Sequence, residues 1–130
     1  MAPLSKGDAV SLSVTPDQYV TVRYAGASGD FNPIHIDEQF ARDVGLPGRI
    51  LHGLWSMAQV ARAAEVAAGD DPTALLSLSV QFRGMGLIGE EITVAGAVTD
   101  VADGVATVKL EAVQGSAKII KGAVAELRAG

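Results

Sequence analysis

Residues 53–82 read GLWSMAQVARAAEVAAGDDPTALLSLSVQF, and the spacing of apolar residues changes inside this stretch. Before Pro72 the apolar residues recur at helical spacing, which predicts a long helix that begins near His52-Gly53 and ends by Gly69. After Pro72, apolar and polar residues alternate from Leu76 to Phe82, which is typical of a half-buried strand. The chain therefore changes here from a helical part to a strand-rich part.

The long predicted helix has one apolar face made mostly of small side chains. Its members are Leu54, Met57, Ala58, Ala61, Ala64 and Ala68, and the opposite face carries Gln59, Arg62 and Glu65. Small side chains let a helix lie close to a neighbouring backbone. We therefore expect the apolar face to pack against the strands.

Shorter elements are predicted before this stretch. Residues 8–14 alternate loosely and predict a short strand. Thr15-Pro16-Asp17 indicates a helix start, because a hydroxyl cap is followed by proline at the first helical position, and this helix should run to about Ala27. Asp37 should cap a second, short helix over residues 38–44, which Gly45 closes.

Strands should fill the rest of the chain. The apolar pattern continues through residues 92–98, 106–112 and 119–127, and Asp103-Gly104 is a strong signal for a tight hairpin. These elements predict an α+β fold, in which one long helix covers a face of an antiparallel sheet. Such a sheet keeps an uncovered face or edge, so we expect dimerisation.

Composition limits the possible classes of protein. The 130 residues are 48% hydrophobic and 19% charged, which predicts one globular domain over residues 1–130. The net charge of −5 argues against general nucleic-acid binding, and the absence of cysteine excludes disulfides and thiolate chemistry. No apolar run could span a bilayer and the N-terminus lacks a signal-peptide core, so a cytoplasmic location is expected.

Residues 24–37, YAGASGDFNPIHID, concentrate groups capable of proton transfer. Asp30 and His35 flank Asn32-Pro33, and the bend made by Gly29 and Pro33 lets both side chains turn towards one point. A carboxylate and an imidazole that converge can take and give a proton near neutral pH. The alternative is an aspartate at a helix end and a histidine with a structural role, but the residues between them favour a functional bend.

A metal site is a second interpretation of the same segment. Asp30, His35 and Asp37 could begin a coordination shell, and His52 would have to complete it from another element. No recognised ligand spacing is present, so we expect neither a metal nor another cofactor.

His52-Gly53 stands where the long helix should begin. A helix N-terminus offers unpaired N–H groups and a partial positive charge, and glycine lets a ligand approach its backbone. The Gly53 N–H is therefore a candidate oxyanion donor for a thioester or other carbonyl. The alternative is that His52 only caps and packs, and we expect His52 to support the helix start rather than to act as a second base.

Among the aromatic residues, Phe31, Phe40, Trp55 and Phe82 are expected in the core or a pocket wall.

The 24–37 motif followed by His52-Gly53 resembles the hydratase motif of the MaoC-like proteins, which are R-specific enoyl-thioester hydratases and dehydratases with the hot dog fold. The resemblance runs from Gly7-Asp8 through the last strand. It implies one hot dog domain, in which an antiparallel sheet wraps around a long central helix.

The resemblance also implies roles for the motif residues. Asp30 and His35 would be the acid–base pair that holds a water, deprotonates it for attack on C3 of a trans-2-enoyl thioester, and delivers a proton to C2. Dehydration of a (3R)-3-hydroxyacyl thioester would be the reverse path. Asn32 would orient the pair or the water, and the Gly53 N–H would polarise the thioester carbonyl.

The implied partners are acyl thioesters and a second hot dog subunit. The substrate would be carried by coenzyme A or acyl carrier protein, in fatty acid, polyketide or related acyl metabolism. Two sheets would join edge to edge in a homodimer, or in a heterodimer with a related subunit. Two alternatives stay open, namely a thioesterase of the same fold and a non-catalytic acyl-binding subunit of a heterodimeric dehydratase.

Overall fold

A computed structural model describes residues 3–129 of the chain. Its elements are, in order, β1 (Ala9–Val14), α1 (Val20–Ser28), α2 (Pro33–Ile36), α3 (Glu38–Asp43), α4 (Gly53–Ala67), the 3₁₀ turn η1 (Pro72–Ala74), β2 (Leu75–Phe82), β3 (Ile92–Ala102), β4 (Val105–Gln114) and β5 (Ala117–Arg128). The predicted change from helices to strands is therefore confirmed.

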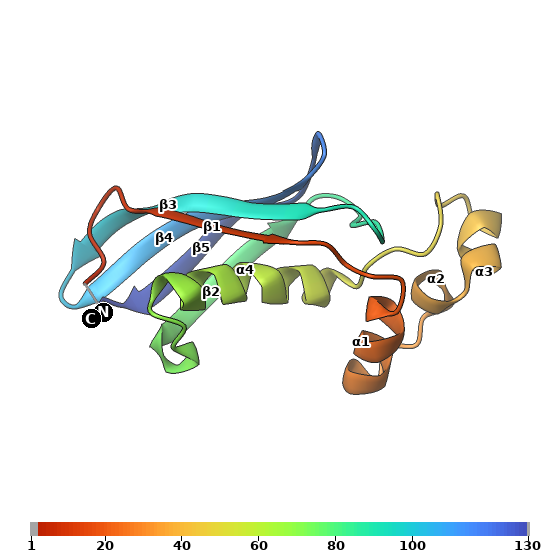
Figure 1. Cartoon of the computed structure of the whole chain (residues 1–130), viewed down its shortest axis with the longest axis horizontal. Helices are drawn as coiled ribbons and strands as arrows, with labels where there is room; N and C mark the ends of the chain where they lie inside the picture. Colours follow the sequence, from red (N-terminus) through yellow and green to blue (C-terminus); the bar gives the residue numbers. More distant parts are fainter. Residues whose placement is uncertain (1–2, 130) are drawn as a thin grey trace.

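The strands form one antiparallel sheet in the order β1-β3-β4-β5-β2. The sheet curves over α4, and α1, α2 and α3 gather beyond the start of that helix (Figure 1). Helix α4 contacts all five strands. This is the predicted α+β arrangement, in which a sheet wraps around one long helix.

The buried face of α4 agrees only in part with the predicted one. Val60, Ala63 and Ala64 are at most 1% exposed and pack in the core, whereas Leu54 is 61% exposed. Gln59, expected on the solvent face, is buried, and its amide donates to the Trp55 carbonyl. Ala64 and Ala68 are buried as predicted, but the rest of the predicted face was wrong because alanines occupy both sides of the helix, so their spacing does not say which side meets the sheet.

Helix α1 begins later than predicted. The Asp17 carboxylate accepts a hydrogen bond from the Tyr19 N–H at 2.8 Å and forms a turn, and the helix starts only at Val20. Asp17 also accepts from the Arg23 guanidinium, which holds the pKa of the Asp17 carboxyl below its usual value. The aspartate therefore organises the turn before the helix instead of standing inside it.

The predicted Asp103-Gly104 hairpin is confirmed. Both residues have positive φ angles, 54° and 77°, as a type I′ turn requires. The turn pairs Ala102 with Val105 and sets the register between β3 and β4.

Strand β2 lies at one edge of the sheet. Leu76 and Phe82 on this strand are 51% and 52% exposed, so the expected uncovered edge is present.

Phe31 and Phe40 are also exposed and lie outside the core, contrary to expectation. Within residues 3–129, no helix is both long enough and apolar enough to cross a membrane.

Candidate active site

The end of α1 positions Asp30. Gly29 closes the helix in the left-handed region, at φ 79°, which glycine adopts without strain. The Ser28 hydroxyl accepts from the Asp30 N–H at 3.1 Å, and the Asp30 Oδ1 accepts from the Asn32 N–H at 3.2 Å. These local bonds fix the backbone and one carboxylate oxygen, while the side chain stays half exposed.

A single helical turn, α2, places His35. Asn32 caps this turn because its Oδ1 accepts from the Ile34 N–H, and Pro33 suits the first helical position. The His35 ring is buried, and its Nδ1 lies 2.8 Å from the Ile50 carbonyl oxygen. A carbonyl only accepts, so Nδ1 carries the proton and the Nε2 of the neutral ring is free to accept one.

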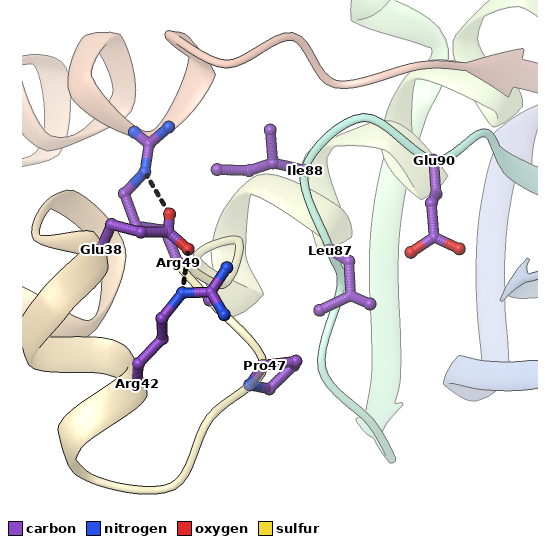
Figure 2. A pocket seen from close by; sticks show the side chains of 8 residues that line it. Glu38, Arg42, Pro47, Arg49, Leu87, Ile88 and Glu90 are labelled. Atoms are coloured by element: carbon purple, nitrogen blue, oxygen red, sulfur yellow. Dashed lines mark hydrogen bonds and ion pairs between the residues drawn. The ribbon is translucent and has the colours of Figure 1, made fainter.

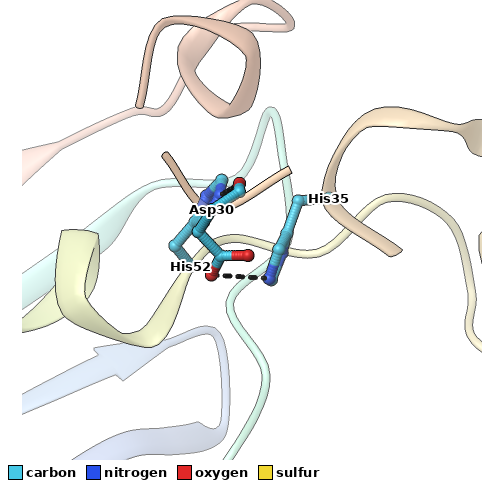
Figure 3. Close-up of side chains that lie close together, drawn as sticks. All are labelled: Asp30, His35 and His52. Atoms are coloured by element: carbon cyan, nitrogen blue, oxygen red, sulfur yellow. Dashed lines mark hydrogen bonds and ion pairs between the residues drawn. The ribbon is translucent and has the colours of Figure 1, made fainter. Parts of the chain in front are cut away.

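The carboxylate of Asp30 and the imidazole of His35 face each other, as the motif predicts (Figure 3). Asp30 Oδ2 and His35 Nε2 are 3.9 Å apart. That separation is too long for a direct hydrogen bond, but one water or hydroxyl oxygen can lie within hydrogen-bonding distance of both atoms. The arrangement can therefore hold a single oxygen between an acid and a base.

His52 joins this pair from the start of α4. Its Nε2 donates to the Asp30 backbone carbonyl at 3.0 Å, and its ring stacks on the His35 ring with centroids 3.9 Å apart. The Tyr24 ring packs against the His52 ring in a tilted arrangement, with the ring centroids 4.8 Å apart. His52 is 2% exposed, its Nε2 is used on the Asp30 carbonyl, and its Nδ1 is buried without a hydrogen-bond partner among residues 3–129, so neither ring nitrogen is open to a ligand.

Gly53, the first residue of α4, borders a cavity of about 300 Å³. Asp30, His52, Leu54 and Phe82 line the same cavity, together with Tyr24 and Ser28. No acceptor on residues 3–129 bonds the Gly53 N–H, which is one of the unpaired donors of a helix N-terminus. The cavity therefore combines an apolar wall, a carboxylate and a free backbone donor.

The metal hypothesis fits the structure poorly. Asp30, His35 and His52 each offer an atom within 4.8 Å of the others, but Asp37 is not among them and instead caps α3 through the Phe40 N–H. His52 already uses Nε2 on the Asp30 carbonyl, and its Nδ1 is covered. Only two free donors remain, fewer than the three protein ligands of a typical catalytic metal site.

A second cavity, of about 280 Å³, opens between α3 and the loop that follows β2 (Figure 2). Arg42 and Arg49 reach into it, but both pair with the Glu38 carboxylate at 3.4 Å. Its charges are therefore largely compensated, and it contains none of the residues that the motif singles out.

Two contacts of the site escaped the sequence reasoning. The Ile50 carbonyl that holds His35 has no side-chain signal, because it acts through its backbone. Tyr24 stands in the motif, inside α1 and six residues before Asp30, and its place in the motif was the available signal that its ring lies near the site.

Comparison with known proteins agrees with the motif. The enoyl-CoA hydratase ChsH3 of Mycobacterium tuberculosis is 36% identical over 86 residues, which are 65% of this chain and 29% of that protein. A fatty acid synthase subunit beta of Aspergillus oryzae is 43% identical over 72 residues, 55% of this chain and 4% of that protein. The chain thus spans less than a third of either relative.

Solved structures share the fold over nearly the full length. The (R)-hydratase from A. caviae involved in PHA biosynthesis superposes with a TM-score of 0.85 at 23% identity, covering 95% of this chain and 96% of that one. A chain of the ChsH1-ChsH2 complex from Mycobacterium tuberculosis gives 0.85 at 25% identity, covering 97% and 98%. The sequence model of the MaoC like domain matches residues 5–118. By that match and by its hot dog fold, the chain belongs to the MaoC-like dehydratase family.

Proposed function

We propose that this protein is a hydro-lyase that adds water to trans-2-enoyl thioesters and removes it from (3R)-3-hydroxyacyl thioesters. The observation that carries the proposal is the 3.9 Å separation of Asp30 Oδ2 and His35 Nε2 beside an open cavity. A buried histidine whose other nitrogen is fixed on a carbonyl is a defined proton acceptor, and the half-exposed carboxylate lies where a water can reach both groups.

In the hydration direction, one water lies between Asp30 and His35. The acid–base pair removes one proton, the water oxygen bonds to C3, and the same pair returns the proton to C2. The second hydrogen stays on the new hydroxyl, so the step is balanced without another reactant. Asn32 contributes by orientation, since its N–H holds Asp30 Oδ1 and its side chain caps the turn that carries His35.

Negative charge develops on the thioester oxygen as the C3–O bond forms. The Gly53 N–H has the properties needed to stabilise this charge, because it stands unpaired at the N-terminus of a 15-residue helix and borders the cavity. Glycine at this position keeps the approach to the N–H open. Asp30, His35, Asn32 and Gly53 thus form the proposed catalytic set.

The proposed substrate is an acyl thioester of coenzyme A or acyl carrier protein, within fatty acid, polyketide or related acyl metabolism. Similarity to enoyl-CoA hydratases and to fatty acid synthase subunits supports this class. A cytoplasmic location stays a prediction.

We also propose that the protein works as a dimer, through the exposed edge of β2. This edge carries the exposed side chains of Leu76 and Phe82. Leu54, at the start of α4, is also exposed, and it lines the same cavity as Phe82. A second copy could cover the edge, and similarity to a chain of the ChsH1-ChsH2 complex supports a related hot dog subunit as the alternative partner.

The activity is tested by mixing purified protein with crotonyl thioesters of both carriers and following the loss of enoyl absorbance. Asp30→Asn keeps the size of the side chain but removes its charge, and His35→Ala removes the ring. Each should lower kcat by about 10²- to 10⁴-fold, the usual contribution of a general acid or base. Intact activity in both variants would refute the mechanism, and release of free thiol would identify a thioesterase instead.

A further inference from the structure

Gln114, the last residue of β4, holds a neighbouring loop through its side-chain amide. The loop comprises residues 83–91 between β2 and β3 and is called the 83–91 loop. Gln114 is 6% exposed, and its Nε2 donates to the carbonyls of Leu87 and Glu90 at 2.8 and 2.9 Å. Its Oε1 accepts from the Leu87 N–H at 2.8 Å. Both backbone polar groups of Leu87 are therefore bonded to one buried side chain.

The other side of Leu87 meets residues 44–52, called the 44–52 segment, which connects α3 to α4. Leu87 forms an isolated antiparallel bridge with Ile50, and the Leu51 N–H donates to the Gly86 carbonyl at 2.9 Å. Figure 2 shows Leu87 on the loop across from Pro47 on the segment. The side-chain amide of Gln114 thus acts as a strand partner for Leu87, with the 44–52 segment on the other side.

The 44–52 segment in turn sets the position of His35. The Ile50 carbonyl accepts from His35 Nδ1 at 2.8 Å, and the Ile50 N–H donates to the Ile34 carbonyl at 3.1 Å. A shift of Ile50 would move the group that fixes both the tautomer and the orientation of the ring. From these contacts we infer that Gln114 is a positioning residue, which holds His35 in the Nδ1–H tautomer through Leu87 and Ile50.

This inference rests on the proposed function for its effect on rate, but its structural part can be tested separately. Gln114→Met keeps the length of the side chain and removes all three hydrogen bonds. A misplacement of about 1 Å far from the chemistry can cost 10²-fold in rate. We therefore expect kcat for crotonyl thioester to fall about 10- to 100-fold while KM changes less than about threefold.

The readout that does not need activity is the ¹⁵N spectrum of the imidazoles. The chain has two histidines, so His52→Phe assigns both rings. When its ring is neutral, wild-type His35 should show a protonated Nδ1 and an unprotonated Nε2. In Gln114→Met the two His35 nitrogens should move towards a common averaged shift, because the ring exchanges between tautomers.

Two further variants keep the test decisive. Val108→Ala shortens a buried side chain on the same strand, and it should lower the melting temperature without changing the His35 shifts. Gly86→Ala perturbs the contact from the other side, because its Cβ would stand 2.7 Å from Leu51 Cδ1, and it carries the test if Gln114→Met does not fold.

A folded Gln114→Met with unchanged His35 shifts overturns the inference, whatever its rate. Moved shifts with a wild-type kcat overturn its catalytic part. If the wild-type protein has no hydratase activity, the proposed function fails, and the ¹⁵N shifts alone then decide whether Gln114 positions His35.

Discussion

Gly53→Ala separates the proposed oxyanion donor from the stability of the fold. An alanine Cβ at this position would lie 3.4 Å from the nearest Phe82 ring carbon, which is ordinary van der Waals contact. Gly53 is not among the positive-φ residues of the described chain, so alanine fits its backbone. The substitution therefore adds one methyl group between the helix start and the cavity wall, and changes little else.

The expected change in stability is small and favourable. Alanine is better than glycine in a helix interior by ~1 kcal/mol, and the first position of α4 should gain only part of this. We expect the free energy of unfolding to rise by about 0 to 1 kcal/mol. Activity should change in the opposite direction, because the methyl group keeps the thioester oxygen away from the Gly53 N–H. Removal of an oxyanion donor costs about 10²- to 10³-fold in kcat, so partial obstruction should cost about 10- to 100-fold.

The assay is the hydration of crotonyl thioester, together with urea denaturation of the same samples. Phe82→Ala added to Gly53→Ala should recover part of the lost rate, because it reopens the space that the methyl group fills. Wild-type kcat/KM in Gly53→Ala would refute the role of the Gly53 N–H. A lower free energy of unfolding together with the lower activity would show instead that the substitution damages the fold.

Three more predictions test other parts of the molecule. His52→Phe keeps a ring on His35 but removes the hydrogen bond to the Asp30 carbonyl, so urea titration should show a loss of about 1 kcal/mol and kcat should fall; a variant as stable and active as wild type contradicts this. Leu76→Asp on the β2 edge should raise the dimer dissociation constant in sedimentation experiments, and an unchanged value excludes that edge as the interface. The hydrogen bond from Arg23 lowers the pKa of Asp17 in the folded protein. The pair therefore stabilises the fold fully when the pH is above the ordinary carboxyl pKa of ~4, and this stabilisation is lost as the pH falls through the pKa of Asp17 in the folded protein. Asp17→Asn should therefore flatten the acid side of the melting-temperature profile, and an unchanged profile would show that this pair does not contribute.

Local chemistry explains which elements the sequence could predict. Asp103-Gly104 specifies a type I′ turn by itself, and the alternation after Pro72 specifies a strand whatever it packs against. Asp37 caps α3 as its spacing predicts. In each case the necessary interactions lie within a few residues of one another.

The errors occur where a distant partner decides the outcome. The buried face of α4 depends on which side the sheet meets, and alanine spacing carries no such information. Gln59 lies on a buried side of α4, and its amide is satisfied there by the Trp55 carbonyl of the same helix, which the residue type alone does not reveal. The position of His35 depends on Ile50 and, through the 83–91 loop, on Gln114, which lies 79 residues further along the chain and has no motif around it.

The most direct test of the proposed reaction is hydration of crotonyl thioester by the wild-type protein in deuterium oxide, followed by NMR of the product. Addition of one water by the Asp30–His35 pair predicts a 3-hydroxybutyryl thioester with one deuterium at C2 of each molecule. Unchanged crotonyl thioester, or crotonate with free thiol, would contradict the account.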